Sequence, residues 1–252
     1  MSAALPADTV AAPRARKAFI PLECNPELMT RLVHDLGLSS RFGFVDVYSI
    51  SDPDLLAFVP RPALALLLVF PVSESYENAR LEEDATLEDW NKKGEEEDPM
   101  WFKQTIRNAC GMMGVLHAVA NGARELIRPD TPLSRLLDRT RPLGRLDRAR
   151  ALEESDELEV AHKHAATQGD SAVPNAEDEV ELHYVCFTKS AKNGHLYELD
   201  GRRKGPLDRG QLGEEDDVLC DKAAAVVQSF IDREKQSGRL DFSLVALTPT
   251  FD

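Results

Sequence analysis

"ALALLLVF", Ala63 to Phe70, is the stretch that decides the fold. Every side chain in it is apolar, and Pro62 and Pro71 bound it on either side. Successive side chains of a strand point to opposite faces of a sheet, so a strand that is apolar on both faces has to be covered on both sides. The stretch therefore predicts a central strand between two packed layers.

The segments around this strand alternate between helical and extended patterns. "NPELMTRLVHDLG" predicts an amphipathic helix, with Asn25 as its N-cap and Gly37 as its stop. Two more helices are expected within residues 132–165, broken near Pro142 and Gly144, and another within 214–236. Further strands are predicted in "FGFVDVYSI", "VELHYVCF", "GHLYELDG" and "DFSLVAL". This order lacks a regular βαβ alternation, which favours an α+β class with a largely antiparallel sheet and flanking helices.

Composition and charge exclude several classes of protein. The chain of 252 residues is 42% hydrophobic, with 44 acidic against 30 basic residues and a net charge of −14. This charge argues against binding to nucleic acid or to an anionic membrane, and favours a basic partner. No apolar run approaches the ~20 residues that span a bilayer. The acidic run at 81–99 is expected to be a solvated helix followed by a loop at 94–99.

The N-terminal residues and the cysteines predict where in the cell the protein is found. Residues 1–17 are predicted to be a disordered tail, because Asp8 and two prolines interrupt any apolar stretch that a signal peptide would need. The four cysteines have no paired spacing and no CxxC: Cys24, Cys110, Cys186 and Cys220. This pattern indicates reduced thiols in the cytosol, with a nuclear fraction left open, and no disulfide framework or zinc site. We expect no cofactor.

The segment "FKQTIRNACGMMGVLHAV", residues 102–119, contains the most interesting of these thiols. Asn108 is a good N-cap, which would put Cys110 in the first turn of an apolar helix. The unpaired N–H groups and the positive end of the helix dipole would then favour thiolate over thiol. The alternative is a packed core cysteine, because free cysteine is among the most buried residue types. On this segment alone both interpretations remain open.

Gln104 supports the catalytic alternative. A thiolate that attacks a carbonyl creates an oxyanion, which needs preorganised hydrogen-bond donors. The Cys110 backbone N–H would be one donor, and the Gln104 side-chain amide from the preceding loop would be a second. A glutamine among charged residues is usually only a surface residue, so this observation supports the hypothesis without deciding it.

A general base is the next requirement, and His183 is the best candidate. It stands inside a predicted strand, which is a rigid setting for a base. His117 lies two helical turns after Cys110, too far to reach it, and is interpreted as a hydrogen-bonded core histidine. The remaining histidines lie on a polar helix face, near a predicted mobile loop or beside a turn: His34, His162, His164 and His195.

Asp200 follows His183 within one predicted hairpin, and the turn decides whether the two can meet. A tight turn at Asn193-Gly194 would leave Asp200 roughly 13 Å along the strand from His183. A four-residue turn at 191–194 sets His183 opposite Arg202, and Asp200 is then one diagonal step of roughly 7 Å away. A Cys-His-Asp triad therefore predicts the looser turn.

"KQTIRNACGMMGVLHAVAN" together with "ELHYVCF…NGHLYELDGRRKGP" resembles the ubiquitin C-terminal hydrolase family of cysteine peptidases. The likeness spans about residues 18–248 and includes "PLECNPE", "DRARALEESDELEVAHKH" and the closing "FSLVAL". The resemblance implies a papain-like helix–antiparallel sheet–helix sandwich with a knotted backbone, in a single catalytic domain over 18–252. One departure is the hairpin at "TKSAKNG", which looks two residues longer than in typical members.

The resemblance also implies the roles of the site residues. Cys110 would be the nucleophile, His183 the base and then the acid, Asp200 the residue that orients His183, and Gln104 part of the oxyanion hole. Four residues would line the groove for the C-terminal tail of ubiquitin: Leu22, Glu23, Glu181 and Leu182. The polar segment at about 161–180 would be the crossover loop that spans the cleft.

The expected activity is thiol-dependent cleavage of small adducts from the C-terminal glycine of ubiquitin. We expect a cytoplasmic monomer whose partner is ubiquitin, without nucleic acid, membrane, metal or cofactor. Two alternatives remain: a module of the same fold that holds ubiquitin without turnover, and a related peptidase that prefers a ubiquitin-like protein such as Nedd8 or cleaves both.

Overall fold

The computed structural model describes residues 17–169, 176, 178, 181–236, 238–239 and 241–250. In this part of the chain the strands form a six-stranded sheet in the order β1-β6-β2-β3-β4-β5, and every neighbouring pair is antiparallel. The strands are β1 (Phe42–Asp46), β2 (Ala65–Pro71), β3 (Leu182–Lys189), β4 (His195–Leu199), β5 (Leu207–Gln211) and β6 (Ser243–Pro249). The predicted antiparallel sheet is confirmed.

Strand β2 lies in the interior of the sheet, between β6 and β3. All of its residues are buried. Its alternate side chains enter two separate cores, Ala65, Leu67 and Val69 on one face and Leu66, Leu68 and Phe70 on the other. The apolar run therefore belongs to a central strand covered on both sides, as the sequence predicts.

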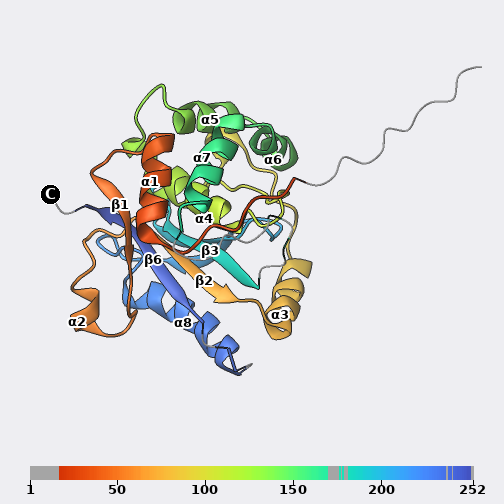
Figure 1. The fold of residues 1–252 in the computed structure, drawn as a ribbon. Helices are drawn as coiled ribbons and strands as arrows, with labels where there is room; N and C mark the ends of the chain where they lie inside the picture. The colour runs from red at the N-terminus through yellow and green to blue at the C-terminus, as the bar shows by residue number, and fades with distance from the viewer. Residues whose placement is uncertain are drawn as a thin grey trace, which may run out of the picture.

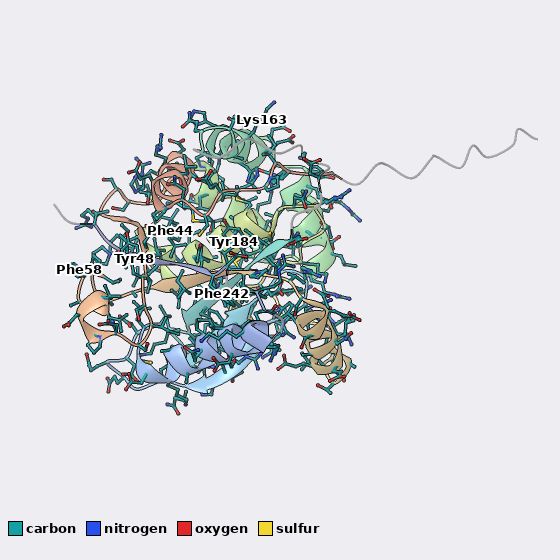
Figure 2. The ribbon with its side chains drawn as sticks, turned by 60° about the horizontal axis from the view of Figure 1, so that its bottom comes forward. Phe44, Tyr48, Phe58, Lys163, Tyr184 and Phe242 are labelled. Carbon is teal, nitrogen blue, oxygen red and sulfur yellow. The ribbon has the colours of Figure 1, made fainter. Side chains whose placement is uncertain are left out.

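Helices cover both faces of the sheet (Figure 1). One layer holds α1 (Pro26–Leu36), α4 (Cys110–Gly122), α5 (Pro132–Thr140), α6 (Arg145–Glu153) and α7 (Asp156–Ala166). The other holds α3 (Glu74–Ala85) and α8 (Asp221–Gln236). The short α2 (Pro53–Leu56) and the 3-10 turns Gly94–Glu96 and Arg124–Leu126 lie in connections. In Figure 2, Phe44 and Tyr184 lie within the molecule, whereas Phe58 beside α2 is at its margin and is 73% exposed.

Helix α1 begins and ends where its sequence predicts. The Asn25 side chain accepts hydrogen bonds from the backbone N–H groups of Glu27 and Leu28. Gly37 ends the helix with φ of 125°, in the left-handed region, and a Cβ there would lie 2.2 Å from the Thr131 hydroxyl. Glycine is therefore required at this position both by backbone conformation and by space.

Three expectations about secondary structure are wrong in detail. Residues 132–165 form three helices rather than two, because Ser155 caps a new helix by accepting from the Leu158 N–H. Residues 161–166, assigned to the crossover loop, continue α7. The edge strand β5 was not expected, because "LDRGQ" shows little apolar alternation.

Several predictions fall largely outside the described residues. Of the predicted tail at 1–17 only Lys17 is described, and its carbonyl accepts from the Arg107 N–H. Most of the crossover loop, 170–175, 177 and 179–180, also lies outside them. The knotted path stays a prediction. Among the described helices, none combines the length and the apolar character that a membrane crossing requires.

The acidic run at 81–99 is not simply a solvated surface. Both Glu97 carboxylate oxygens accept from Arg148 at 2.6 Å, and the two side chains are each 1% exposed. Arg148 also donates to the carbonyls of Trp101, at 2.6 Å, and Thr140, at 3.1 Å. This buried ion pair fixes the segment that leads to Gln104, so the acidic run contributes to the architecture of the site.

Replacement of Arg148 by methionine should destabilise the protein strongly. The substitution leaves the Glu97 carboxylate buried without its partner, which costs about 3–5 kcal/mol of the free energy of unfolding. Urea denaturation followed by circular dichroism measures this loss. The exposed neighbour Arg150, whose side chain is 67% exposed, supplies the matched control, and Arg150→Met should change stability by less than about 1 kcal/mol. Equal losses in both variants would contradict the structural role of the buried pair.

Candidate active site

Cys110 is the first residue of α4 and is partly buried. The next residue, Gly111, lies so close to the N-terminal segment that a Cβ would be 2.9 Å from the Leu22 Cβ. This close approach brings Leu22 beside the thiol. The predicted position of Cys110 at a helix start is confirmed.

The predicted N-cap is wrong. The N-cap position is Ala109, and no side chain caps the helix. Asn108 has φ of 56°, in the left-handed region, and its amide donates instead to the carbonyls of Ala176 and Asp178, both at 2.9 Å. As a result, no side chain of the described residues occupies the first N–H groups of α4, which are the groups that attract negative charge at a helix start.

His183 and Asp200 are in contact, and the turn between their strands is the looser one that this contact requires. Strands β3 and β4 pair from Cys186 with Leu199 to Lys189 with Leu196, and residues 191–194 form the turn between them. Extending this register sets His183 opposite Arg202. The His183 Nε2 lies 2.9 Å from Asp200 Oδ1, and both side chains are buried, at 4% and 0% exposed. With Nε2 engaged, Nδ1 is the ring nitrogen left to exchange a proton with a thiol.

The Asp200 carboxylate is held by several further groups. Its Oδ1 accepts from the Arg202 N–H at 2.8 Å, and its Oδ2 accepts from the Tyr76 hydroxyl at 3.4 Å. The Trp101 indole N–H donates to the Asp200 carbonyl at 3.1 Å. The Gln104 N–H donates to the carbonyl of Gly201 at 2.9 Å. These bonds connect the segment before Cys110 directly to the loop that carries Asp200.

The electrostatics of the pair favour a charged imidazole. Burial disfavours the imidazolium, but the charge of Asp200 and its hydrogen bond outweigh burial, and Cys110 adds to them, so the pKa of His183 rises to about 9. Burial would raise the pKa of Asp200, yet the His183 charge and hydrogen bonds hold it well below its usual range. The site therefore holds a carboxylate and an imidazolium at neutral pH, and the imidazolium is a suitable counterion for a thiolate.

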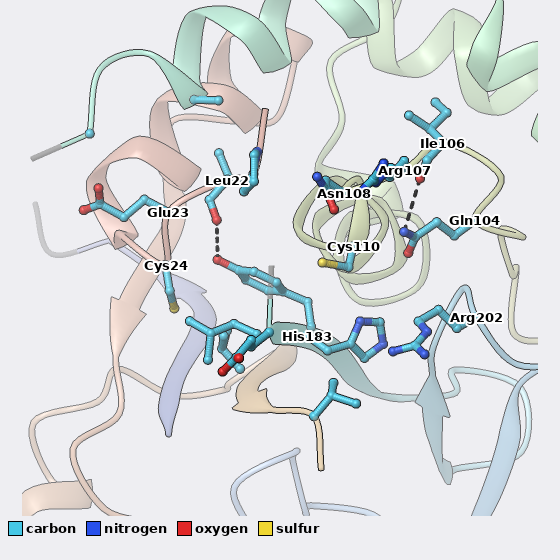
Figure 3. A pocket seen from close by; sticks show the side chains of 18 of the residues that line it. Leu22, Glu23, Cys24, Gln104, Ile106, Arg107, Asn108, Cys110, His183 and Arg202 are labelled. Carbon is cyan, nitrogen blue, oxygen red and sulfur yellow. Dashed lines mark hydrogen bonds between the residues drawn. The ribbon is translucent and has the colours of Figure 1, made fainter. Parts of the chain in front are cut away.

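Gln104 lies at the same cavity, but its amide is oriented differently from the expectation. Its Nε2 donates to the Ile106 carbonyl at 3.2 Å (Figure 3). The Oε1 atom is buried and has no hydrogen-bond partner among the described residues. A flipped amide would set two carbonyl oxygens against each other, so this orientation is the stable one. Because an amide nitrogen carries two hydrogens, one N–H remains for an oxyanion.

A cavity of about 760 Å³ connects these groups. Cys110, His183 and Gln104 line it, as do all four residues expected along the ubiquitin tail: Leu22, Glu23, Glu181 and Leu182. Leu22 is buried at 5% exposed, whereas Leu182 is 41% exposed. Glu181 forms an ion pair with Arg239. In Figure 3, Leu22 and Glu23 lie on one side of Cys110, and Gln104 and Arg202 lie on the other.

The competing histidines and cysteines have other roles. His117 is buried and accepts the Phe102 N–H at 3.0 Å, as expected of a core histidine, and its pKa is lowered by burial to about 3. Burial likewise lowers the pKa of His162, which bonds to the Ile20 carbonyl, to about 4. Burial raises the pKa of the Cys24 thiol to about 11 and that of Cys186 well above its ordinary value. Neither thiol is therefore suited to be a nucleophile at neutral pH.

Several supporting residues were not found from the sequence. Tyr76, Trp101 and the Arg202 backbone contact Asp200 from three separate segments. Nothing in their local patterns marks them, because their role depends on long-range contacts.

A thiol at a helix start, beside an imidazolium that a buried carboxylate orients, can attack a carbonyl and pass a proton to the leaving group. This chemistry is that of the cysteine peptidases. The profile described as ubiquitin carboxyl-terminal hydrolase, family 1, matches residues 19–232. The chain belongs to this family.

Individual relatives agree with the family assignment. Human ubiquitin carboxyl-terminal hydrolase isozyme L1 is 38% identical over 230 residues, which cover 90% of this chain and 96% of that protein. A probable ubiquitin carboxyl-terminal hydrolase of Dictyostelium discoideum is 38% identical over 235 residues, 92% of this chain and 88% of its own length. The catalytic domain of Trichinella spiralis UCH37, solved bound to ubiquitin vinyl methyl ester, shares the fold with a TM-score of 0.69 at 18% identity, over 92% of this chain and 96% of that one.

Replacement of Asp200 by asparagine should lower kcat/KM by about 10²- to 10⁴-fold, because the imidazolium loses its buried counterion. It should also move the alkaline limb of the pH profile. The pKa of His183 is raised to about 9, so its protonated form is lost only as pH rises through that value. Without the Asp200 charge, burial pulls this pKa toward or below the ordinary value of about 6.5, and activity should fall at correspondingly lower pH.

The raised pKa of His183 also makes the stability of the protein depend on pH. Because the pKa of His183 is higher in the folded than in the unfolded protein, its contribution is fully present below about pH 6.5 and is lost as pH rises through about 9. Rates on a small fluorogenic adduct between pH 5 and 10 measure the activity limb, and urea unfolding over the same range measures the stability. An Asp200→Asn variant with an unshifted alkaline limb would contradict the assignment of His183 as the titrating group.

Proposed function

We propose that this chain is a thiol-dependent ubiquitinyl hydrolase, a cysteine-type deubiquitinase that releases small adducts or peptides from the C-terminal glycine of ubiquitin. The observation that carries the proposal is the set formed by Cys110 at the start of α4 and the buried His183–Asp200 pair in one cavity. Membership of the family supports ubiquitin as the substrate. Two solved structures of the same fold, both of Trichinella spiralis UCH37, are bound to ubiquitin vinyl methyl ester.

The reaction proceeds by acyl transfer. The Cys110 thiolate attacks the carbonyl carbon of the terminal glycine, and the resulting oxyanion is stabilised by the Cys110 backbone N–H and the free N–H of Gln104. His183 donates its Nδ1 proton to the leaving amine as the C–N bond breaks, which leaves a thioester on Cys110. His183, now neutral, takes a proton from water as the water attacks the thioester, and the thiolate leaves.

The cavity offers a groove of suitable chemistry for the tail of ubiquitin. The tail carries arginines, and the cavity is lined by the acidic side chains of Glu23 and Glu181 and by the apolar side chains of Leu22 and Leu182. The net charge of −14 favours association with such a basic segment. Ubiquitin is therefore the expected partner. A monomer in the cytoplasm is the expected working state, and rates on matched ubiquitin and Nedd8 adducts would determine whether both are cleaved.

A ubiquitin probe with a C-terminal electrophile tests the nucleophile. It should label Cys110 and spare the other three thiols, because Cys24 and Cys186 have raised pKa values and Cys220 lies outside the cavity. Peptide mapping by mass spectrometry identifies the labelled residue. Cys110→Ala should abolish both labelling and hydrolysis. Labelling at another cysteine, or hydrolysis by Cys110→Ala, would overturn the assignment, and the latter result would leave a module that binds ubiquitin without turnover.

The crossover loop predicts a preference for small leaving groups. A crossover loop of the kind that the family resemblance implies would limit what can pass, and of the expected loop the described residues Ala176 and Asp178 are held at the start of α4 by Asn108. Small or unfolded adducts should therefore be cleaved much faster than folded ones. The test compares kcat/KM for a small fluorogenic ubiquitin adduct with that for ubiquitin dimers. Dimers cleaved as fast as the small adduct would refute the hypothesis.

A further inference from the structure

The ionisable side chains around the cavity are almost all engaged with a partner. The pairs are His183 with Asp200, Glu77 with Arg202 and Glu181 with Arg239. Glu23 also has an interaction partner. Arg107 is the exception, because no hydrogen bond or ion pair to its guanidinium is found among the described residues, although it lines the cavity and is exposed. A cation that has no partner among the described residues, at the cleft of a protein with net charge −14, is available to a ligand.

The backbone of Arg107 is fixed on both sides. Its N–H donates to the Lys17 carbonyl and its own carbonyl accepts from the Phe19 N–H, both at 2.9 Å, so that residue 107 forms a parallel bridge with Ala18. The following residue, Asn108, holds the described part of the crossover segment. The backbone of Arg107 is thus fixed three residues before the nucleophile, and its exposed side chain lines the cleft.

Figure 3 places Arg107 between Asn108 and Ile106, toward the side of Cys110 that holds Gln104. The tail groove, with Leu22 and Glu23, lies on the other side. A basic ubiquitin tail gains nothing from a nearby cation, because like charges repel. The chemistry that Arg107 can recognise is a carboxylate on the part of the substrate that leaves.

We propose that Arg107 is a specificity residue for the leaving group, and that it favours adducts with a carboxylate within one or two residues of the scissile amide. This inference rests on the proposed hydrolysis of ubiquitin adducts. The contact is partly exposed, so its effect is modest. An acidic extension should exceed a basic one by about two- to fivefold in kcat/KM, the range expected for an exposed ion pair. The ratio should fall toward one as salt is raised, because the screening length shrinks from about 10 Å at 0.1 M to about 3 Å at 1 M.

The test uses the full chain and three ubiquitin extension peptides that differ only in their first residue, which is Glu, Gln or Lys. The readout is the Glu-to-Lys ratio of kcat/KM within each variant, so a general loss of activity cancels. Arg107→Ala should bring the ratio close to one, and Arg107→Glu should invert it. Arg150→Glu makes the same change of charge on an exposed residue of α6 and should keep the wild-type ratio.

The outcomes separate the two proposals. A ratio in Arg107→Glu equal to that of the wild type would overturn the role of Arg107. A shift of the same size in Arg150→Glu would also overturn it, since the effect would then belong to bulk charge. If the wild type cleaves none of the three extensions, including the neutral Gln peptide, the proposed hydrolase function itself fails.

Discussion

The buried hydrogen bond between His183 and Asp200 is the interaction on which the site depends. It joins a strand residue to the residue that follows the next strand, so it can form only in one register of the β3–β4 hairpin. The four residues at 191–194 set that register, and the Ser190 N–H bond to the His195 carbonyl closes the ladder. A slip of one residue would turn His183 to the opposite face of the sheet. The His183–Asp200 bond therefore depends on the register that the turn sets. Strand β3 is held in place on its other side by its pairing with the wholly buried β2.

The segment from Glu97 to Gln104 connects the His183–Asp200 pair to the helix that begins with the nucleophile. On one side it is bound to α4, where His117 accepts the Phe102 N–H and Asn121 bonds to both backbone groups of Met100. On the other it is bound to the Asp200 loop through Trp101 and Gln104. Lys103 adds bonds to the carbonyls of Arg202 and Arg203. The helix that begins with Cys110 and the loop that orients His183 are thus both bonded to the segment from Glu97 to Gln104. The buried Arg148–Glu97 pair fixes the start of this segment.

The parts of the structure that follow from local pattern were predictable. The two-faced apolar run of β2 and the caps of α1 at Asn25 and Gly37 depend on residues that lie close together in sequence. The local pattern left two registers open for the hairpin, and the requirement that His183 meet Asp200 selected the one observed. The parts that were missed depend on distant partners. Asn108 looked like an N-cap, yet its amide bonds to residues nearly seventy positions away, at 2.9 Å from Ala176 and Asp178. Glu97 looked solvated, because its partner Arg148 lies on a different helix. Charge patterns cannot reveal such pairs, since a carboxylate in an acidic run is identical in sequence whether or not a guanidinium reaches it.

Two buried histidines have opposite pKa shifts because only one of them bonds to a carboxylate. As whole residues, His117 and His183 are both almost completely buried, at 0% and 3% exposed. Burial lowers the pKa of His117 to about 3, so its Nε2 stays unprotonated and accepts the Phe102 N–H. Burial acts on His183 in the same direction, but the Asp200 carboxylate reverses it and raises the pKa to about 9. The neutral histidine can then hold the main chain of the oxyanion segment at any physiological pH, while the charged one remains the proton donor. The same residue type thus has a structural role at one position and a chemical role at the other, depending on the group that lies opposite the ring.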